Sequence, residues 1–160
     1  MPRHKKAEFT REIGVDPRYN SELIQKLINV VMVDGKKSIA RRIVYESIDG
    51  LLKKAGGDKE KALKIFHRAF EQVVPAVEVK PRRVGGSVYQ IPMEVQSNRG
   101  RALALRWIID AAAGRPDKTM GKRLTSEYLD ASEGRGNAVK KKLDVHKMAE
   151  SNRAFSHYAW

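Results

Sequence analysis

The residues best suited to do chemistry in this sequence are its lysines and arginines, which gather in separated clusters. They occur in the amino-terminal segment, in Gly35-Lys36-Lys37-Ser38, at Arg82-Arg83, in Arg99-Gly100-Arg101, and along the last two predicted helices. Lysine binds phosphate as a point charge, and the arginine guanidinium binds it through paired hydrogen bonds. Charge spread over several elements favours a folded RNA over duplex DNA, which is more often read by one groove-entering element.

The overall charge supports a polyanionic partner. The 160 residues include 32 Lys plus Arg against 19 Asp plus Glu, a formal charge of +13. Such an excess attracts phosphates or an anionic membrane. No apolar run approaches the roughly 20 residues that a membrane span needs, and no apolar segment follows the first basic residues to make a signal peptide. We therefore expect a cytoplasmic protein without a membrane partner.

The sequence contains no recognisable catalytic constellation. It has no cysteine, and none of its 4 histidines belongs to a serine, carboxylate or metal-binding pattern. Gly35-Lys36 is not a Walker motif, because the required earlier glycine is replaced by Val30. The lysines there either grip a phosphate at a helix start or belong to a solvated turn. We predict a protein that is not an enzyme and binds no metal and no cofactor.

Side chains between Val77 and Val95 alternate with a period of two, which indicates β-strands. Proline and paired glycines interrupt the alternation over residues 81–86, where two arginines would occupy the apex of a turn. The pattern predicts an extruded β-hairpin with strands at about 76–80 and 87–91. Because an isolated hairpin is marginally stable in water, its base must lie against helices while its tip reaches outward.

Most of the remaining chain shows helical spacing of apolar residues, so the predicted fold is mainly α, with about six helices in one bundle-like domain. Asn20-Ser21 and Asp58 can cap helices, whereas Asp34-Gly35, Ala55-Gly56-Gly57 and Pro75 end them. The phenylalanines of the third helix are expected in the core.

The later helices have distinct patterns. Residues 102–113 are nearly apolar all round, which is typical of a central helix surrounded by others. Asp117 is expected to open the next helix. The last helix starts near Asn137 or Ala138, and lysines in its first turns oppose the helix dipole, which favours a nearby anion. Its inward face is expected to carry Val139, Leu143, His146 and Ala149.

We expect three segments along the chain. Residues 1–18 form a basic tail that is disordered when free and orders on a partner, or else a solvated terminus without a role. Residues 19–154 form a single helical RNA-binding domain with the hairpin arm at 76–95. Residues 155–160 form an aromatic tail that can pack, stack on bases or meet another protein.

Several sequence blocks resemble a known family, the small ribosomal subunit protein seven family in its bacterial or organellar form, over nearly the full length. The first block has the spacing Ser21, Leu23, Leu27-Ile28, Gly35-Lys36-Lys37, Ile43-Val44 and Ser47. The others are Lys80-Pro81-Arg82-Arg83-Val84-Gly85-Gly86, Tyr89-Gln90-Ile91-Pro92-Met93-Glu94-Val95, Ala104-Leu105-Arg106-Trp107, and Gly136-Asn137-Ala138-Val139-Lys140-Lys141-Lys142.

The resemblance implies a structural ribosomal protein that binds the 3′ major domain of small-subunit ribosomal RNA and nucleates assembly of the subunit head. It also implies a hairpin near the exit-site tRNA and the mRNA path. Small-subunit proteins nine and eleven would be neighbours, and the chain would not act as a homo-oligomer. An organellar ribosome is an alternative location.

Site residues are predicted from the charge clusters and from positions that match the family blocks. The predicted ribosomal RNA contacts are Arg3, Lys5, Lys6, Lys36, Lys37, Arg99, Arg101, Arg115, Lys118, Lys140, Lys141 and Lys142. The predicted hairpin positions near tRNA and mRNA are Lys80, Arg82, Arg83, Val84, Gly85 and Gly86.

An architectural DNA-binding protein is the alternative from another class. Asn20-Ser21-Glu22-Leu23-Ile24 resembles the opening of histone-like HU proteins, which also extend proline-bearing β-arms into the minor groove. That fold is much shorter and has no counterpart for the helices after residue 97.

Overall fold

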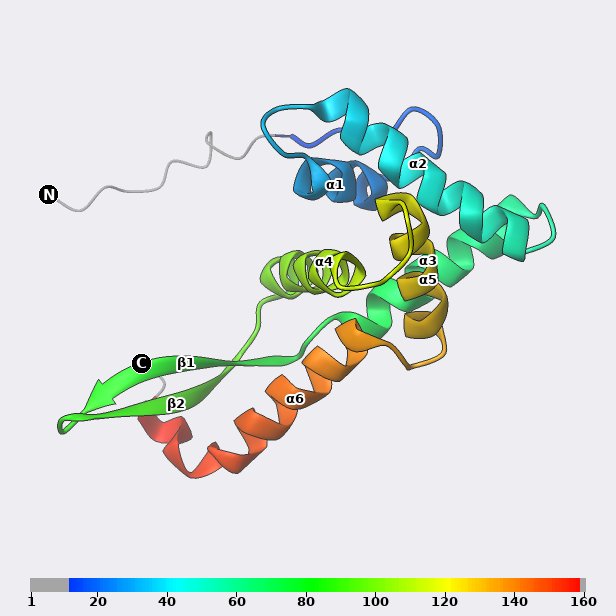
Figure 1. Ribbon diagram of the computed structural model, residues 1–160. Coiled ribbons are helices and arrows are strands. Elements are labelled where there is room, and N and C mark those ends of the chain that lie inside the picture. The colour runs from blue at the N-terminus through cyan, green and yellow to red at the C-terminus, as the bar shows by residue number, and fades with distance from the viewer. Residues whose placement is uncertain (1–11, 159–160) are drawn as a thin grey trace, which may run out of the picture. The chain divides into compact units, whose positions relative to one another are not determined.

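The computed structural model describes residues 12–158. Within this part of the chain lie six α-helices, one 3₁₀ helix and a two-stranded antiparallel sheet (Figure 1). The predicted fold, mainly helical with one β-hairpin, is confirmed. The chain divides into two compact units, one up to Val44 and the other from Tyr45 onward.

The first unit contains α1 (Glu22–Val31) and the beginning of α2 (Lys37–Lys54). Ser21 caps α1 as predicted, because its side chain accepts a hydrogen bond from the backbone N–H of Ile24. Ile24, Leu27 and Ile28 are completely buried on one face of the helix. The predicted amphipathic helix is therefore present, and it ends just before the turn at Asp34-Gly35.

In the second unit, Asp58 caps α3 (Lys59–Val73), also as predicted. Its carboxylate accepts the backbone N–H groups of Lys61 and Glu60, which lower the pKa of Asp58 although desolvation opposes the shift. Phe66 and Phe70 are buried, which confirms their assignment to the core. The Phe66 ring meets Tyr128 edge to face, with ring centroids 5.2 Å apart.

The hairpin consists of β1 (Val77–Val84) and β2 (Ser87–Glu94), and it projects from the helices (Figure 1). Val84 pairs with Ser87, so the strands extend farther than the predicted 76–80 and 87–91. The turn is only two residues long because Gly85 and Gly86 have φ angles of 57° and 92°, which glycine adopts readily. Pro81 is tolerated inside β1 because each strand of a two-stranded sheet has an unpaired edge.

The remaining elements are α4 (Ser97–Ala113), α5 (Met120–Ser132), α6 (Asn137–Ser151) and the 3₁₀ helix η2 (Arg153–Tyr158). Gly100 lies buried in the first turn of α4, where a Cβ atom would stand 3.2 Å from the carbonyl oxygen of Pro75. A glycine lowers the intrinsic stability of this helical turn. Because it has no side chain, it also lets α4 approach the segment that leads into the hairpin. None of the helices in residues 12–158 is long and apolar enough to cross a membrane.

Two local predictions were wrong. Thr119, not Asp117, caps α5: its side chain accepts from the backbone N–H of Lys122 and donates to Glu46 on α2 at 2.6 Å. Leu143 of α6 is 59% exposed instead of buried. The neighbouring elements contact α6 on the side of Val139 and Ala149, and Leu143 lies outside that face.

The hairpin contacts α6 at its base and η2 farther along β2. The backbone N–H of Ala76 donates to His146 Nε2 at 3.3 Å. Farther along β2, the rings of Tyr89 and Phe155 lie 4.7 Å apart. Of the alternatives for the aromatic segment, packing is what the structure shows for Phe155.

Candidate nucleic-acid interface

At four of the six described α-helices, the charges at the helix start are reversed relative to what an isolated helix prefers. A helix dipole favours acidic residues in the first turn and basic residues in the last. Among the described helices, α1 and α3 follow the first preference, whereas α2, α4, α5 and α6 have no acidic residue in the first turn. α4, α5 and α6 also have no basic residue in the last turn. The first turns of these four helices instead carry Lys37, Arg99, Lys122, Arg123 and Lys140.

Several of the predicted contact residues are exposed and have no ion pair or side-chain hydrogen bond within residues 12–158. A cation of this kind keeps its full capacity for an external phosphate, because no carboxylate of the chain competes for it. Lys122 of α5 belongs with them although it was not among the predicted contacts; its position in the first turn of a helix was the signal that was missed. The set consists of Lys37, Arg83, Arg101, Lys118, Lys122, Lys140 and Lys141.

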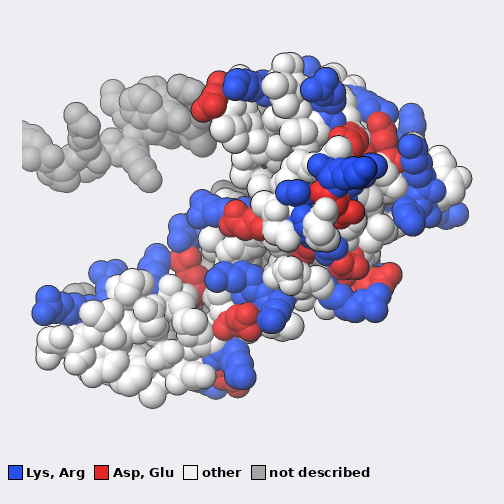
Figure 2. All heavy atoms as spheres, viewed as in Figure 1, with Lys and Arg blue, Asp and Glu red and all other residues white. Residues whose placement is uncertain are grey.

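The hairpin carries the predicted Lys80, Arg82 and Arg83 on β1, and of these Arg82 and Arg83 lie close to the turn. Figure 2 shows Lys and Arg side chains gathered toward the end of the hairpin, next to a broad uncharged surface. Arg82 and Arg83 are exposed, and the glycines Gly85 and Gly86 leave the tip without bulk. The tip is thus both cationic and slender, so a phosphate backbone can approach it closely.

Arg99 has a structural partner at the hairpin base. Its guanidinium reaches both carboxylate oxygens of Glu78 at 2.8 Å, and Lys80 lies 3.3 Å from the same group. The hydrogen bond from Arg99 lowers the pKa of Glu78 against the opposing effect of desolvation, and Lys80 lowers it further. Arg99 therefore joins α4 to β1 while about half of its side chain stays exposed.

Arg115 differs from the other predicted contacts because it is mostly enclosed, with 17% of its side chain exposed. Its Nε donates to Glu127 at 2.7 Å and its Nη2 donates to Asp130 at 2.5 Å. Burial alone would lower the pKa of Arg115, but the hydrogen bonds to Asp130 and Glu127 raise it. Arg115 therefore ties the segment before α5 to α5 itself, and its contact with ribosomal RNA stays a prediction.

Glu127 connects this ion pair to the start of α6. The side chain is completely buried, and its second oxygen accepts the backbone N–H of Ala138 at 2.9 Å. Gly136 precedes the helix with φ +94°, and a Cβ atom there would stand 2.9 Å from that same oxygen. A carboxylate from α5 thus satisfies the amino end of α6 from inside, and the outer side is left to Lys140 and Lys141.

The other predicted contacts divide into three cases. Lys36 lies 3.9 Å from Asp34 in the turn before α2, and both side chains are largely exposed. Lys142 donates to the backbone carbonyl of Gln72 at 2.8 Å, which ties α6 to α3. Arg3, Lys5 and Lys6 lie outside the described residues.

The fold and its charges define a class, small basic helical proteins with a projecting β-hairpin. A family model described as ribosomal protein S7p/S5e matches residues 2–153. Small ribosomal subunit protein uS7 of Afipia carboxidovorans is 54% identical over 160 residues, which is 100% of each chain. The proteins of that name from Vibrio campbellii and Vibrio vulnificus are 53% and 52% identical over the same span. The chain belongs to the ribosomal protein S7p/S5e family.

This family assignment confirms the recognised resemblance and decides against the architectural DNA-binding alternative. The chain is a structural protein of the small ribosomal subunit and takes part in translation within a ribonucleoprotein. It is not an enzyme, because the family is structural, and it is located in the ribosome of the cytoplasm. Its partners are small-subunit ribosomal RNA and other ribosomal proteins.

Proposed function

We propose that this chain binds the 3′ major domain of small-subunit ribosomal RNA directly and nucleates assembly of the subunit head. The observation that carries the proposal is the set of exposed Lys and Arg side chains on α2, α4, α5 and α6 that have no ion pair or side-chain hydrogen bond within residues 12–158. Several of them lie near helix starts, where the helix dipole also favours a phosphate. RNA phosphates supply that charge to several elements of the protein.

The binding mechanism is neutralisation of phosphates by cations that the fold leaves unpaired. Lys37, Arg101 and Lys140 are exposed representatives on three different helices. Each neutralised phosphate releases condensed counterions, so the affinity falls by about 0.7–0.9 log units per log unit of salt for each phosphate bound. Binding to several elements at once demands a folded RNA with a matching shape.

The hairpin has a separate role in this proposal. The base is anchored by the ion pair between Arg99 and Glu78, whereas Arg82 and Arg83 are exposed near the turn of the hairpin. We assign the tip to the surroundings of exit-site tRNA and the mRNA path, with small-subunit proteins nine and eleven as neighbours. Residues 1–18 would contact ribosomal RNA as a basic tail, although Asp16 within this segment is already buried and accepts the backbone N–H groups of Arg18 and Tyr19. Residues 19–154 would act as one RNA-binding domain, and residues 155–160 would form the aromatic tail.

Filter binding tests the proposal. The purified chain is titrated with a transcript of the 3′ major domain, with an equally long structured RNA of unrelated sequence, and with duplex DNA, each over a salt series. Preferential binding of the transcript with a steep salt dependence is expected. Equal affinity for all three nucleic acids would refute specific recognition of ribosomal RNA.

Paired charge variants then identify the RNA-binding surface. Lys140→Gln with Lys141→Gln is expected to reduce the slope of log affinity against log salt by about 0.7–0.9 for each phosphate that is no longer neutralised. Lys64→Gln is the control, because Lys64 is also an exposed lysine on a helix but lies away from the helix start. If Lys64→Gln lowers the salt slope as much as the loss of one α6 lysine does, RNA binding depends only on the net charge of the protein.

The hairpin role requires a different readout. Arg82→Ala with Arg83→Ala is expected to leave folding and binding of the transcript largely intact and to disturb tRNA binding at the exit site of reconstituted subunits. Deletion of residues 1–12 provides the comparison, because that tail is assigned to ribosomal RNA. A loss of transcript affinity from the hairpin variant as large as that from the deletion would contradict this division of roles.

A further inference from the structure

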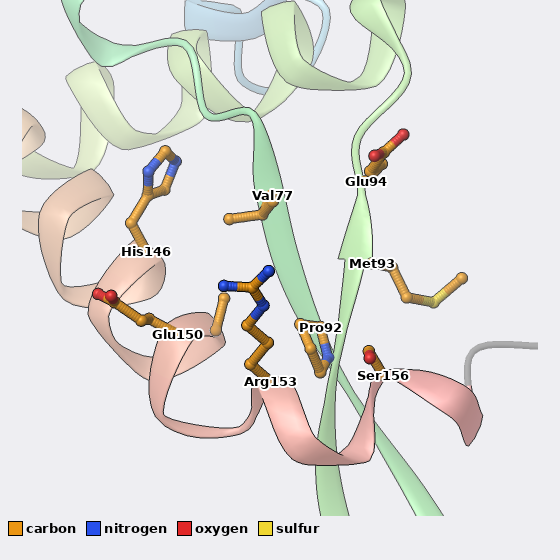
Figure 3. A pocket seen from close by; sticks show the side chains of 9 residues that line it. Val77, Pro92, Met93, Glu94, His146, Glu150, Arg153 and Ser156 are labelled. Atoms are coloured by element: carbon orange, nitrogen blue, oxygen red, sulfur yellow. The ribbon is translucent and has the colours of Figure 1, made fainter.

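A pocket of about 460 Å³ lies between the base of the hairpin and the end of α6. Its volume falls within the range of about 300–1,000 Å³ that is usual for ligand sites. Val77, Pro92 and Ala149 supply apolar wall, and Arg153 lies among them. Figure 3 shows the Arg153 side chain rising between α6 and β1, with its guanidinium turned toward Val77.

The Arg153 guanidinium has no hydrogen-bonding or ion-pair partner within residues 12–158. An arginine that lies beside apolar side chains without a carboxylate partner presents a flat cationic face to whatever enters the pocket. Planar nucleobases stack on such faces in complexes with single-stranded RNA.

The charges around the pocket favour a neutral ligand group. Glu94 on the β2 side and Glu150 on the α6 side also belong to the lining, and their carboxylates lie at opposite edges of the pocket, turned away from Arg153 (Figure 3). His146 accepts the N–H of Ala76 at Nε2, and burial followed by the charge of Lys142 lowers its pKa, so its ring is neutral near pH 7. A phosphate inside the pocket would meet more negative than positive charge. A base with amino protons would instead find acceptors at the rim.

We propose that this pocket holds the base of an unpaired nucleotide of the ribosomal RNA, with the base stacked on Arg153 and its phosphates left outside. The inference rests on the proposed function, because it names the group that one part of the RNA interface receives. Carboxylates accept hydrogen bonds from amino groups such as that of cytosine. Adenine, guanine and cytosine, which each carry an amino group, therefore fit the rim better than uracil, which has none.

The test fills the pocket without disturbing the core. Ser156→Trp adds a large side chain at an exposed position that lines the pocket, and Ala154→Trp adds the same side chain at an exposed position of η2 outside the lining. Affinity for the 3′ major domain transcript is measured by filter binding over a salt series. Chemical probing of unpaired adenines, guanines, cytosines and uracils is performed on each complex.

Ser156→Trp is expected to weaken binding about 5- to 150-fold with an unchanged salt slope. This decrease corresponds to base stacking worth about 1–3 kcal/mol, converted at about 1.4 kcal/mol per tenfold. One unpaired adenine, guanine or cytosine should be protected by the unmodified chain and by Ala154→Trp but not by Ser156→Trp. Arg153→Gln should remove the same protection, whereas Lys147→Gln, a charge change on α6 outside the lining, should retain it.

The outcomes separate the two proposals. If the unmodified chain prefers the transcript but Ser156→Trp and Ala154→Trp bind it equally well and protect the same bases, the pocket proposal is overturned and RNA binding stands. If the unmodified chain has no preference for the transcript, the proposed function fails and the pocket assignment fails with it.

Discussion

Removal of the Glu127 carboxylate is expected to destabilise the second unit more than any surface charge change. Glu127 is 0% exposed, and its two oxygens accept from Arg115 Nε at 2.7 Å and from the N–H of Ala138 at 2.9 Å. Glu127→Ala leaves an enclosed guanidinium with one carboxylate fewer and an unsatisfied donor at the start of α6. Breaking one side of a buried ion pair costs about 3–5 kcal/mol.

The free energy of unfolding of a domain is roughly 5–15 kcal/mol, so a cost of this size is a large part of it. Because about 1 kcal/mol shifts the melting temperature by about 2–4 °C at this chain length, a decrease of about 6–20 °C is expected. Thermal and urea unfolding followed by circular dichroism measure the decrease. Hydrogen exchange of the Ala138 amide reports the start of α6 separately.

Two variants make the measurement specific. Glu133→Ala removes a carboxylate that pairs with Arg135 at the surface, where both side chains are more than half exposed, and should cost about 0–1 kcal/mol. Glu127→Gln retains an oxygen that can accept the N–H of Ala138 but has no charge to pair with Arg115. Its loss of stability should therefore lie between those of Glu133→Ala and Glu127→Ala. If Glu127→Ala costs no more than Glu133→Ala, the buried carboxylate does not hold α5 and α6 together.

Three further outcomes follow from single interactions. Burial and the charge of Lys142 lower the pKa of His146 in the folded state below its ordinary 6.5, so the unfolded chain takes up the proton first. The free energy of unfolding, measured by urea titration, should therefore fall as the pH drops through 6.5. His146→Gln should remove this pH dependence, and a dependence that persists in the variant would refute the role of His146. Gly136→Ala should cost about 1–3 kcal/mol in the same titrations, because φ +94° is strained for alanine; a neutral result would contradict the strain. The aromatic pair of Tyr89 and Phe155 should contribute a coupling energy of about 0.5–1.5 kcal/mol. A double-mutant cycle with Tyr89→Ala and Phe155→Ala measures this energy, and additive effects of the two substitutions would show that the pair is not coupled.

The hairpin and most helix starts were predictable from the sequence because local chemistry determines them. Ser21 and Asp58 cap helices through their own neighbouring backbone N–H groups, so type and position were sufficient. The period-two pattern identified the hairpin, but the length of its strands depended on the turn. Two adjacent glycines allow either a wide loop or a tight turn, and only the pairing of Val84 with Ser87 decides between them.

The candidate RNA-binding residues were also largely visible in the sequence, since basic residues at helix starts need no tertiary information to be noticed. The sequence did not show which of these residues are free to bind a phosphate, because this depends on which carboxylates the fold brings close to them. Arg115 and Arg101 look equivalent in the sequence, yet the first is enclosed by Glu127 and Asp130 while the second is exposed. Arg153 stands between Asn152 and Ala154, outside any cluster of basic residues, and only the fold places it in a pocket.

What the sequence determined by itself was the set of elements, the excess of positive charge and the family blocks, because each rests on residues close together in the chain. What only the tertiary structure decided was which long-range interactions form. Leu143 has the spacing of a buried residue and is exposed, since burial depends on which side of α6 the other elements contact. Glu127 has the chemistry of a surface residue and is buried, because Arg115 and the start of α6 together satisfy both of its oxygens.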